Sequence, residues 1–126
     1  MDKQEVFNKS YLGLKKQKFE AAFNKSGICV YRNEDGTKRC AIGQLISDEA
    51  YDKNIEGYAV HQVFDVLSLN SERGQILWEV LKKSIPGIRE SDIQFLVDLQ
   101  HAHDKFSKVK ENLEQVAKDN NLTIPE

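Results

Sequence analysis

A heptad stripe near the C-terminus constrains the fold of this chain more than any other part of its sequence. Apolar residues recur there at alternating spacings of four and three: Phe95, Leu99, Ala102, Phe106, Val109, Leu113 and Val116. The spacing predicts one long helix over residues 92–117, with Ser91 as its N-cap. So short a stripe is more typical of packing against helices of the same chain than of a free coiled coil. A homodimer formed through the 92–117 helix is the alternative.

Three other segments show helical periodicity. Residues 2–24 carry apolar side chains three and four positions apart, and they predict a helix that ends at Ser26-Gly27, where glycine can adopt the left-handed conformation. Residues 58–67 return to the same spacing. Residues 71–84 predict a further helix that ends before Pro86-Gly87.

A turn signal lies between the first two helical segments. Asp35-Gly36 readily supplies the positive φ angles of a tight turn, so residues 28–32 and 37–41 are predicted to form the arms of a β-hairpin. The expected fold class is therefore α+β: a mostly helical small domain over residues 1–126, with one β-hairpin packed beside a helix bundle.

Composition excludes several classes of protein. Hydrophobic residues make up 40% and charged residues 30% of the 126 residues, which is typical of a globular chain with one core. The net charge of −2 argues against general nucleic-acid binding. No apolar run approaches the roughly 20 residues that cross a bilayer, and the charged N-terminus lacks the apolar core of a secretory signal. We therefore expect a cytoplasmic protein that does not interact with membranes.

The two cysteines, Cys29 and Cys40, lie on opposite arms of the predicted hairpin. A four-residue loop would pair Arg32 with Thr37 and place the thiols opposite each other, whereas a two-residue turn would pair Tyr31 with Cys40 and separate them. The simplest interpretation is that both are buried small hydrophobic residues. Half of a zinc site, a redox pair or disulfide, and a catalytic thiol remain as alternatives.

A catalytic or metal role would need a histidine near these thiols. His103 is the best placed, on the flank of the heptad stripe, while His101 and His103 point about 200° apart on a helix and cannot share one metal. A cysteine enzyme would use His103 to lower the thiol pKa. We expect the hairpin to share a cleft with Gln100, His103 and Asp104.

Two groups of basic residues could hold an anion. Arg32 follows Tyr31 on the first hairpin arm, and an arginine beside an aromatic ring can bind a carboxylate or phosphate, although a surface salt bridge is the more common use. Lys15, Lys16 and Lys18 could form a local basic patch, but a solvated helix face is the simpler interpretation.

The chain resembles a group of small proteins encoded by tailed phages and prophages, without an assigned function. The matching pattern is C-x-Y-R, a turn glycine, then K-x-C-A-x-G-x-L-I, an acidic loop ending in Tyr, and Glu-Gly; a distal L-Q-x-x-H-D follows. The matching residues are Cys29, Tyr31, Arg32, Gly36, Cys40, Ala41, Gly43, Leu45, Ile46, Tyr51, Glu56, Gly57, Leu99, Gln100, His103 and Asp104. One residue is inserted here, because Lys and Cys are adjacent in the family pattern, and this leaves the hairpin register open.

The resemblance implies a phage accessory protein that acts in the cytosol of the host cell. We expect a non-enzymatic binding protein, without a cofactor, that acts on a host protein or a small signal molecule and thereby disarms host defence. Its predicted binding residues are Cys29, Tyr31, Arg32, Cys40, Gln100, His103 and Asp104. The alternative function is a small thiol- or zinc-dependent enzyme or metal protein that uses Cys29, Cys40 and His103.

Overall fold

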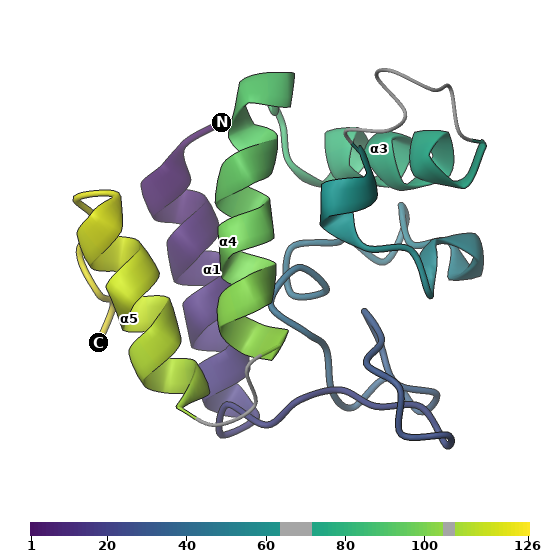
Figure 1. Ribbon diagram of the computed structural model, residues 1–126, viewed down its shortest axis with the longest axis horizontal. Helices are drawn as coiled ribbons and strands as arrows, with labels where there is room; N and C mark the ends of the chain where they lie inside the picture. The colour runs from purple at the N-terminus through teal and green to yellow at the C-terminus, as the bar shows by residue number, and fades with distance from the viewer. Residues whose placement is uncertain (64–71, 105–107) are drawn as a thin grey trace.

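The computed structural model describes residues 1–63, 72–104 and 108–126. The longer helices of these parts are α1 (Lys3–Lys16), α3 (Glu72–Ser84), α4 (Ile93–Asp104) and α5 (Val109–Asp119). Single 3-10 turns are formed by η1 (Lys53–Ile55), η2 (Val60–Gln62) and η3 (Glu90–Asp92). A long irregular segment joins α1 to η1, and α3 lies apart from the other long helices (Figure 1).

Helices α1, α4 and α5 form one layer, with α1 drawn in purple beside the green and yellow C-terminal pair (Figure 1). Side chains tie α1 to both neighbours. The Tyr11 hydroxyl donates to the Glu114 carboxylate of α5 at 2.8 Å, and the Lys3 ammonium lies 5.4 Å from the centre of the Phe95 ring on α4. The Tyr11 ring stacks on Phe7 and meets Phe19 edge-on.

The predicted single helix over residues 92–117 is wrong, because the chain forms two helices that pack on each other. α4 ends at Asp104, and α5 begins after Lys108, whose backbone has a left-handed φ of 63°. Leu99 and Leu113 of the heptad stripe are fully buried within the chain, as expected for packing against helices of the same chain. Phe106 lies outside the described residues.

The other helix predictions had mixed outcomes. α3 agrees with the predicted helix over 71–84. α1 starts at an Asp2 cap but stops at Lys16, because Lys18 and Phe19 both have left-handed φ angles; the predicted end at Ser26-Gly27 is therefore wrong. Of the predicted helix over 58–67, the 3-10 turn at Val60–Gln62 is seen, and residues from 64 onward lie outside the described parts.

The predicted β-hairpin is wrong, and with it the α+β class, because the described parts of the chain contain no strand or sheet and are helical. Residues 22–40 make only two isolated antiparallel bridges, Phe23 with Cys29 and Arg32 with Arg39. In the second bridge the Cys40 amide donates to the Tyr31 carbonyl at 3.2 Å. This pairing places Tyr31, and not Cys29, opposite Cys40.

Side chains from distant parts of the sequence accept hydrogen bonds from backbone amides on both arms of the Arg32–Arg39 bridge. The Glu56 carboxylate accepts from the Tyr31 amide at 2.8 Å, the Arg32 amide at 3.2 Å and the Tyr51 hydroxyl at 2.6 Å. The Arg39 amide donates to the Gln17 side chain at 3.1 Å. In the register of the bridge the Tyr31 amide would donate to the Cys40 carbonyl, so Glu56 takes one donor that a ladder would use, whereas the Arg32 and Arg39 amides point away from the partner arm.

The segment that follows the second bridge is built into the core. Ala41, Ile42, Leu45 and Ile46 are buried, and the buried Ser10 hydroxyl of α1 donates to the Ala41 carbonyl at 2.8 Å. Gly43 is required here, because a Cβ atom at this position would meet the Tyr31 carbonyl oxygen. None of the described helices is both long enough and apolar enough to span a membrane.

We predict that Glu56→Gln lowers the free energy of unfolding by about 2 kcal/mol, because an amide cannot replace all the acceptor positions of the carboxylate and leaves a backbone N–H unpaired. Urea unfolding followed by circular dichroism measures the change. Glu49→Gln is the control, because the exposed Glu49 side chain makes no hydrogen bond or ion pair with the described residues. Equal stability of the two variants would contradict the role given to Glu56.

Candidate functional site

Tyr31 of the predicted binding set is a buried structural residue. Its amide is held by Glu56, and its hydroxyl donates to the Tyr58 carbonyl at 2.6 Å. Burial is the main cause that raises the Tyr31 pKa well above its usual value. The side chain is therefore neutral and has no free polar group to offer a ligand.

Arg32 is also held inside the fold. Its guanidinium donates to the Ile46 carbonyl at 2.9 Å, stacks 4.4 Å from the centre of the Tyr51 ring, and lies 3.0 Å from the Asp48 carboxylate. The Arg32 Nε is buried and has no hydrogen-bond partner among the described residues. The Nη2 atom of Arg32 thus makes both the hydrogen bond to the Ile46 carbonyl and the ion pair with the exposed Asp48 carboxylate.

Cys29 and Cys40 are separate free thiols. Cys40 is fully buried, and its sulfur accepts the Gly43 amide at 3.2 Å. Burial is the largest cause that raises the pKa of Cys40 to about 12. Burial followed by the negative charge of Asp104 raises the pKa of the half-buried Cys29. Both thiols are therefore protonated near neutral pH, which is unfavourable for nucleophilic catalysis.

Gln100, His103 and Asp104 lie in the last turn of α4, close to the irregular segment. After burial, the negative charge of Asp104 is a smaller cause of the raised pKa values of Cys29, Tyr31 and Cys40. The Gln100 amide donates to Asp104 at 3.1 Å. The side-chain hydrogen bonds that these three residues make with described residues stay within α4, so the predicted cleft that they share with residues 28–41 stays a prediction.

The predicted binding residues do not form an open site, because Tyr31, Cys40 and His103 are all buried. The Nε2 atom of His103 and the Oε1 atom of Gln100 are buried without a hydrogen-bond partner in the described parts of the chain. Within those parts no three His, Cys, Asp or Glu side chains are grouped as metal ligands would be. The arrangement is a polar layer of the core.

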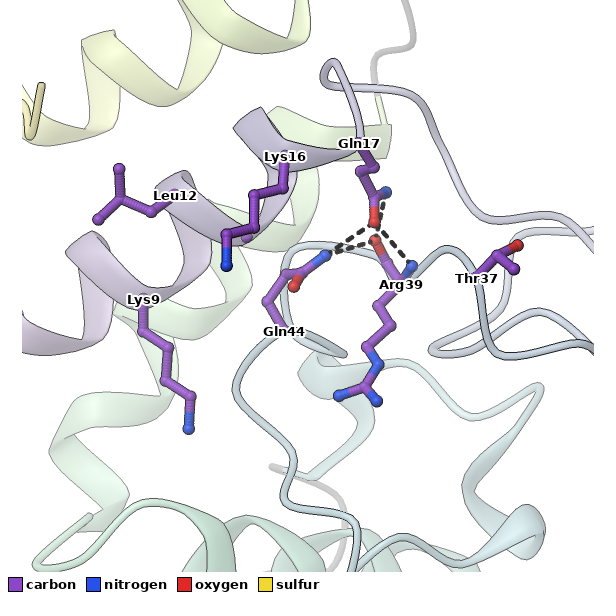
Figure 2. A pocket seen from close by; sticks show the side chains of 8 residues that line it. Lys9, Leu12, Lys16, Gln17, Thr37, Arg39 and Gln44 are labelled. Atoms are coloured by element: carbon purple, nitrogen blue, oxygen red, sulfur yellow. Dashed lines mark hydrogen bonds between the residues drawn. The ribbon is translucent and has the colours of Figure 1, made fainter.

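The best candidate for a binding site is a groove between α1 and the segment around residues 37–44 (Figure 2). It has a volume of about 470 Å³ and is lined by Lys9, Leu12, Gly13, Lys16, Gln17, Thr37, Arg39 and Gln44. Three of these side chains are cationic and none is acidic. We call this feature the basic groove.

Two glutamines fix the walls of the basic groove relative to each other (Figure 2). Gln17, which caps the end of α1, donates to the Arg39 carbonyl at 2.8 Å and accepts from the Arg39 amide at 3.1 Å. The Gln44 amide donates to Gln17 at 3.0 Å and to the Arg39 carbonyl at 3.2 Å. Gly13 leaves room for Gln44, because a Cβ atom there would overlap the Gln44 side-chain oxygen.

The cations of the groove are available to a ligand to different degrees. Lys9 and Lys16 extend from α1 without an ion-pair partner among the described residues (Figure 2). Arg39 extends from the opposite wall, and its guanidinium lies 3.2 Å from Asp48. The groove therefore combines two unpaired positive charges with one charge that is already paired.

A second hollow, of about 700 Å³, lies beside Arg32, and its lining residues carry both positive and negative charges. Its lining contains two basic residues, Arg32 and Lys53, and three acidic residues, Glu34, Asp35 and Glu56. The Glu56 carboxylate already accepts three hydrogen bonds inside the fold. This mixture favours no class of ligand, in contrast to the basic groove.

The basic groove is not predicted by the sequence pattern, which places Lys16 on a solvated helix face. One signal was present, since Lys9 and Lys16 are seven positions apart and therefore lie on the same face of a helix. The contribution of Gln17, Arg39 and Gln44 depends on how the irregular segment folds back on α1, which no local pattern indicates.

The chain matches no protein-family model, and comparisons with curated proteins and with solved structures give no match either.

We predict that thiol labelling at pH 8 separates the two cysteines. Cys29 should react slowly and Cys40 not measurably in the folded protein, because burial and a pKa of about 12 leave almost no accessible Cys40 thiolate. Mass spectrometry of the alkylated protein measures both sites, and unfolding in urea should make them equally reactive. Fast labelling of Cys40 in the folded Cys29→Ser variant would contradict the assignment.

Proposed function

We propose that the protein is a non-enzymatic binding protein whose basic groove holds a small phosphorylated ligand. The observation that carries the proposal is the charge of the groove: Lys9, Lys16 and Arg39 converge on one hollow that has no acidic lining residue. In a protein with a net charge of −2, such a local excess of positive charge is not a consequence of overall composition. Phosphate oxygens are the natural partners of clustered lysine and arginine side chains.

The size of the groove supports a small ligand in preference to a polymer. Pockets for small molecules commonly measure about 300–1,000 Å³, and the basic groove falls within this range at about 470 Å³. A general nucleic-acid binder would require a longer basic surface that neutralises many phosphates. Leu12, which is partly exposed at the rim, offers an apolar contact for the remainder of a ligand.

The groove is better suited to binding than to catalysis. Its polar side chains other than the cations are mostly engaged with each other, as the Gln17 and Gln44 amides are, and no thiol or histidine lines it. The alternative function would rely on Cys29, Cys40 and His103; Cys40 and His103 are buried, and burial raises the pKa of both thiols, which disfavours the thiolate. We therefore favour the binding function over a thiol- or zinc-dependent enzyme.

The resemblance to tailed-phage proteins supplies a setting for this activity. A phage accessory protein that sequesters a small signal molecule in the host cytosol would withhold that molecule from a defence pathway. Phosphorylated signal molecules carry the charge that the basic groove complements. Binding of a host protein at the same surface is the other form of the proposal, and the experiment below separates the two.

We predict that Lys9→Gln combined with Lys16→Gln weakens the binding of inorganic pyrophosphate about tenfold, since each cation contributes up to about 1 kcal/mol at an accessible site. Isothermal titration calorimetry measures the affinity. Lys15→Gln combined with Lys18→Gln is the matched control, because it removes the same charge from exposed lysines outside the groove.

Equal weakening by the two double variants would indicate only general electrostatic attraction. Failure of the unsubstituted protein to bind pyrophosphate, with tight capture of a host protein that depends on Lys9 and Lys16, would replace the small ligand by a protein partner.

A further inference from the structure

Two arginines that face each other across an isolated bridge share one acidic side chain. Arg32 and Arg39 are antiparallel bridge partners, and like charges placed opposite each other repel. Both guanidinium groups, through their Nη2 atoms, approach the same oxygen, Oδ1 of Asp48, at 3.0 Å and 3.2 Å. A single carboxylate oxygen thus lies between two positive charges at the edge of the basic groove.

The two arginines differ in how firmly they are held. Arg32 has only 13% of its side chain exposed and is fixed by the Ile46 carbonyl and the Tyr51 ring. The Arg39 side chain is 31% exposed, and Asp48 is its only hydrogen-bond or ion-pair partner among the described residues. Arg39 can therefore change partners, whereas Arg32 stays in place.

Asp48 itself is weakly held. Its side chain is 74% exposed, so the ion pairs that it makes are largely solvated. Exposed pairs of this kind contribute little to stability, and an anion with more charge and more acceptor oxygens can displace the carboxylate. Phosphate groups have both properties, and guanidinium groups bind them through parallel hydrogen bonds.

We propose that Asp48 occupies an anion subsite between Arg32 and Arg39, and that a phosphate group of the ligand takes this subsite by displacing the carboxylate. The inference rests on the proposed function, because the subsite borders the basic groove through Arg39. It also narrows the class of ligand. A compound with two linked phosphates places one phosphate near Lys9 and Lys16 and the other between the arginines.

The test compares the affinity of inorganic pyrophosphate for the full chain and for Asp48→Asn. The substitution keeps the shape and an acceptor oxygen of Asp48 but removes the competing charge, so the affinity should rise about three- to fivefold, as expected for an exposed ion pair. Glu49→Gln is the matched control. Glu49 is the next residue after Asp48 and carries the same charge, but its side chain makes no hydrogen bond or ion pair with the arginines. Calorimetry at constant ionic strength measures all three proteins.

A second measurement, by NMR spectroscopy, reports directly whether the ligand displaces the Asp48 carboxylate from the two arginines. The carboxyl carbon resonance of Asp48 should shift when pyrophosphate saturates the unsubstituted protein, while that of Glu49 should not. Binding that is equal in Asp48→Asn and Glu49→Gln, or weaker in Asp48→Asn because the carboxylate positions Arg39, would overturn the subsite and leave the proposed function standing. No binding of pyrophosphate to any of the three proteins would overturn both.

Discussion

The carboxylate of Glu56 holds together the part of the molecule that has no regular secondary structure. It accepts the Tyr31 and Arg32 amides and the Tyr51 hydroxyl, and so it connects the two ends of a loop of about 25 residues by strong, charge-assisted bonds. Because the Tyr31 and Arg32 backbone is fixed in this way, the Arg32 side chain can be directed toward Asp48 and the Tyr31 carbonyl toward Cys40. The placement of Arg39, and hence of one wall of the basic groove, follows from the same anchor.

The polar residues of the chain divide into two sets with different physical roles. One set, which includes Tyr31, Cys40 and His103, is buried, and burial keeps the tyrosine and the thiol neutral. The other set lies at the surface, where lysine and arginine side chains remain charged and accessible. Tyr31, Cys40 and His103, which were predicted as site residues, belong to the first set, whereas Lys9, Lys16 and Arg39 of the basic groove belong to the second. Arg32 connects the two sets, because its side chain is mostly buried and its guanidinium still reaches the exposed Asp48 carboxylate.

How far the sequence predicts this structure depends on the range of the interactions involved. The helix at 72–84 is specified by local periodicity, and the burial of Leu99 and Leu113 by the heptad spacing. The break before α5 was not predicted, because a lysine in the left-handed conformation, as at Lys108, carries no residue signal of the kind that glycine provides. The hairpin was mispredicted for a related reason. Asp35-Gly36 indicates a turn correctly, but its flanks pair only at the Arg32–Arg39 bridge, beside which the Tyr31 amide donates to Glu56, a residue distant in the sequence.

The hydrogen bonds of Tyr31 and Arg32 also determine how this region opens. In a β-ladder, each amide is released as its own rung separates, and the ends fray first. Here one carboxylate holds two adjacent amides and a tyrosine hydroxyl, so withdrawal of Glu56 exposes all three groups at once. The Tyr31 and Arg32 amide hydrogens are thereby expected to exchange together, at a lower free energy than the amides of α1, α4 and α5. Loss of the Glu56 hydrogen bonds would release the backbone at Arg32, the bridge partner of Arg39 in the wall of the basic groove, while Gln17 and Gln44 still hold Arg39 itself.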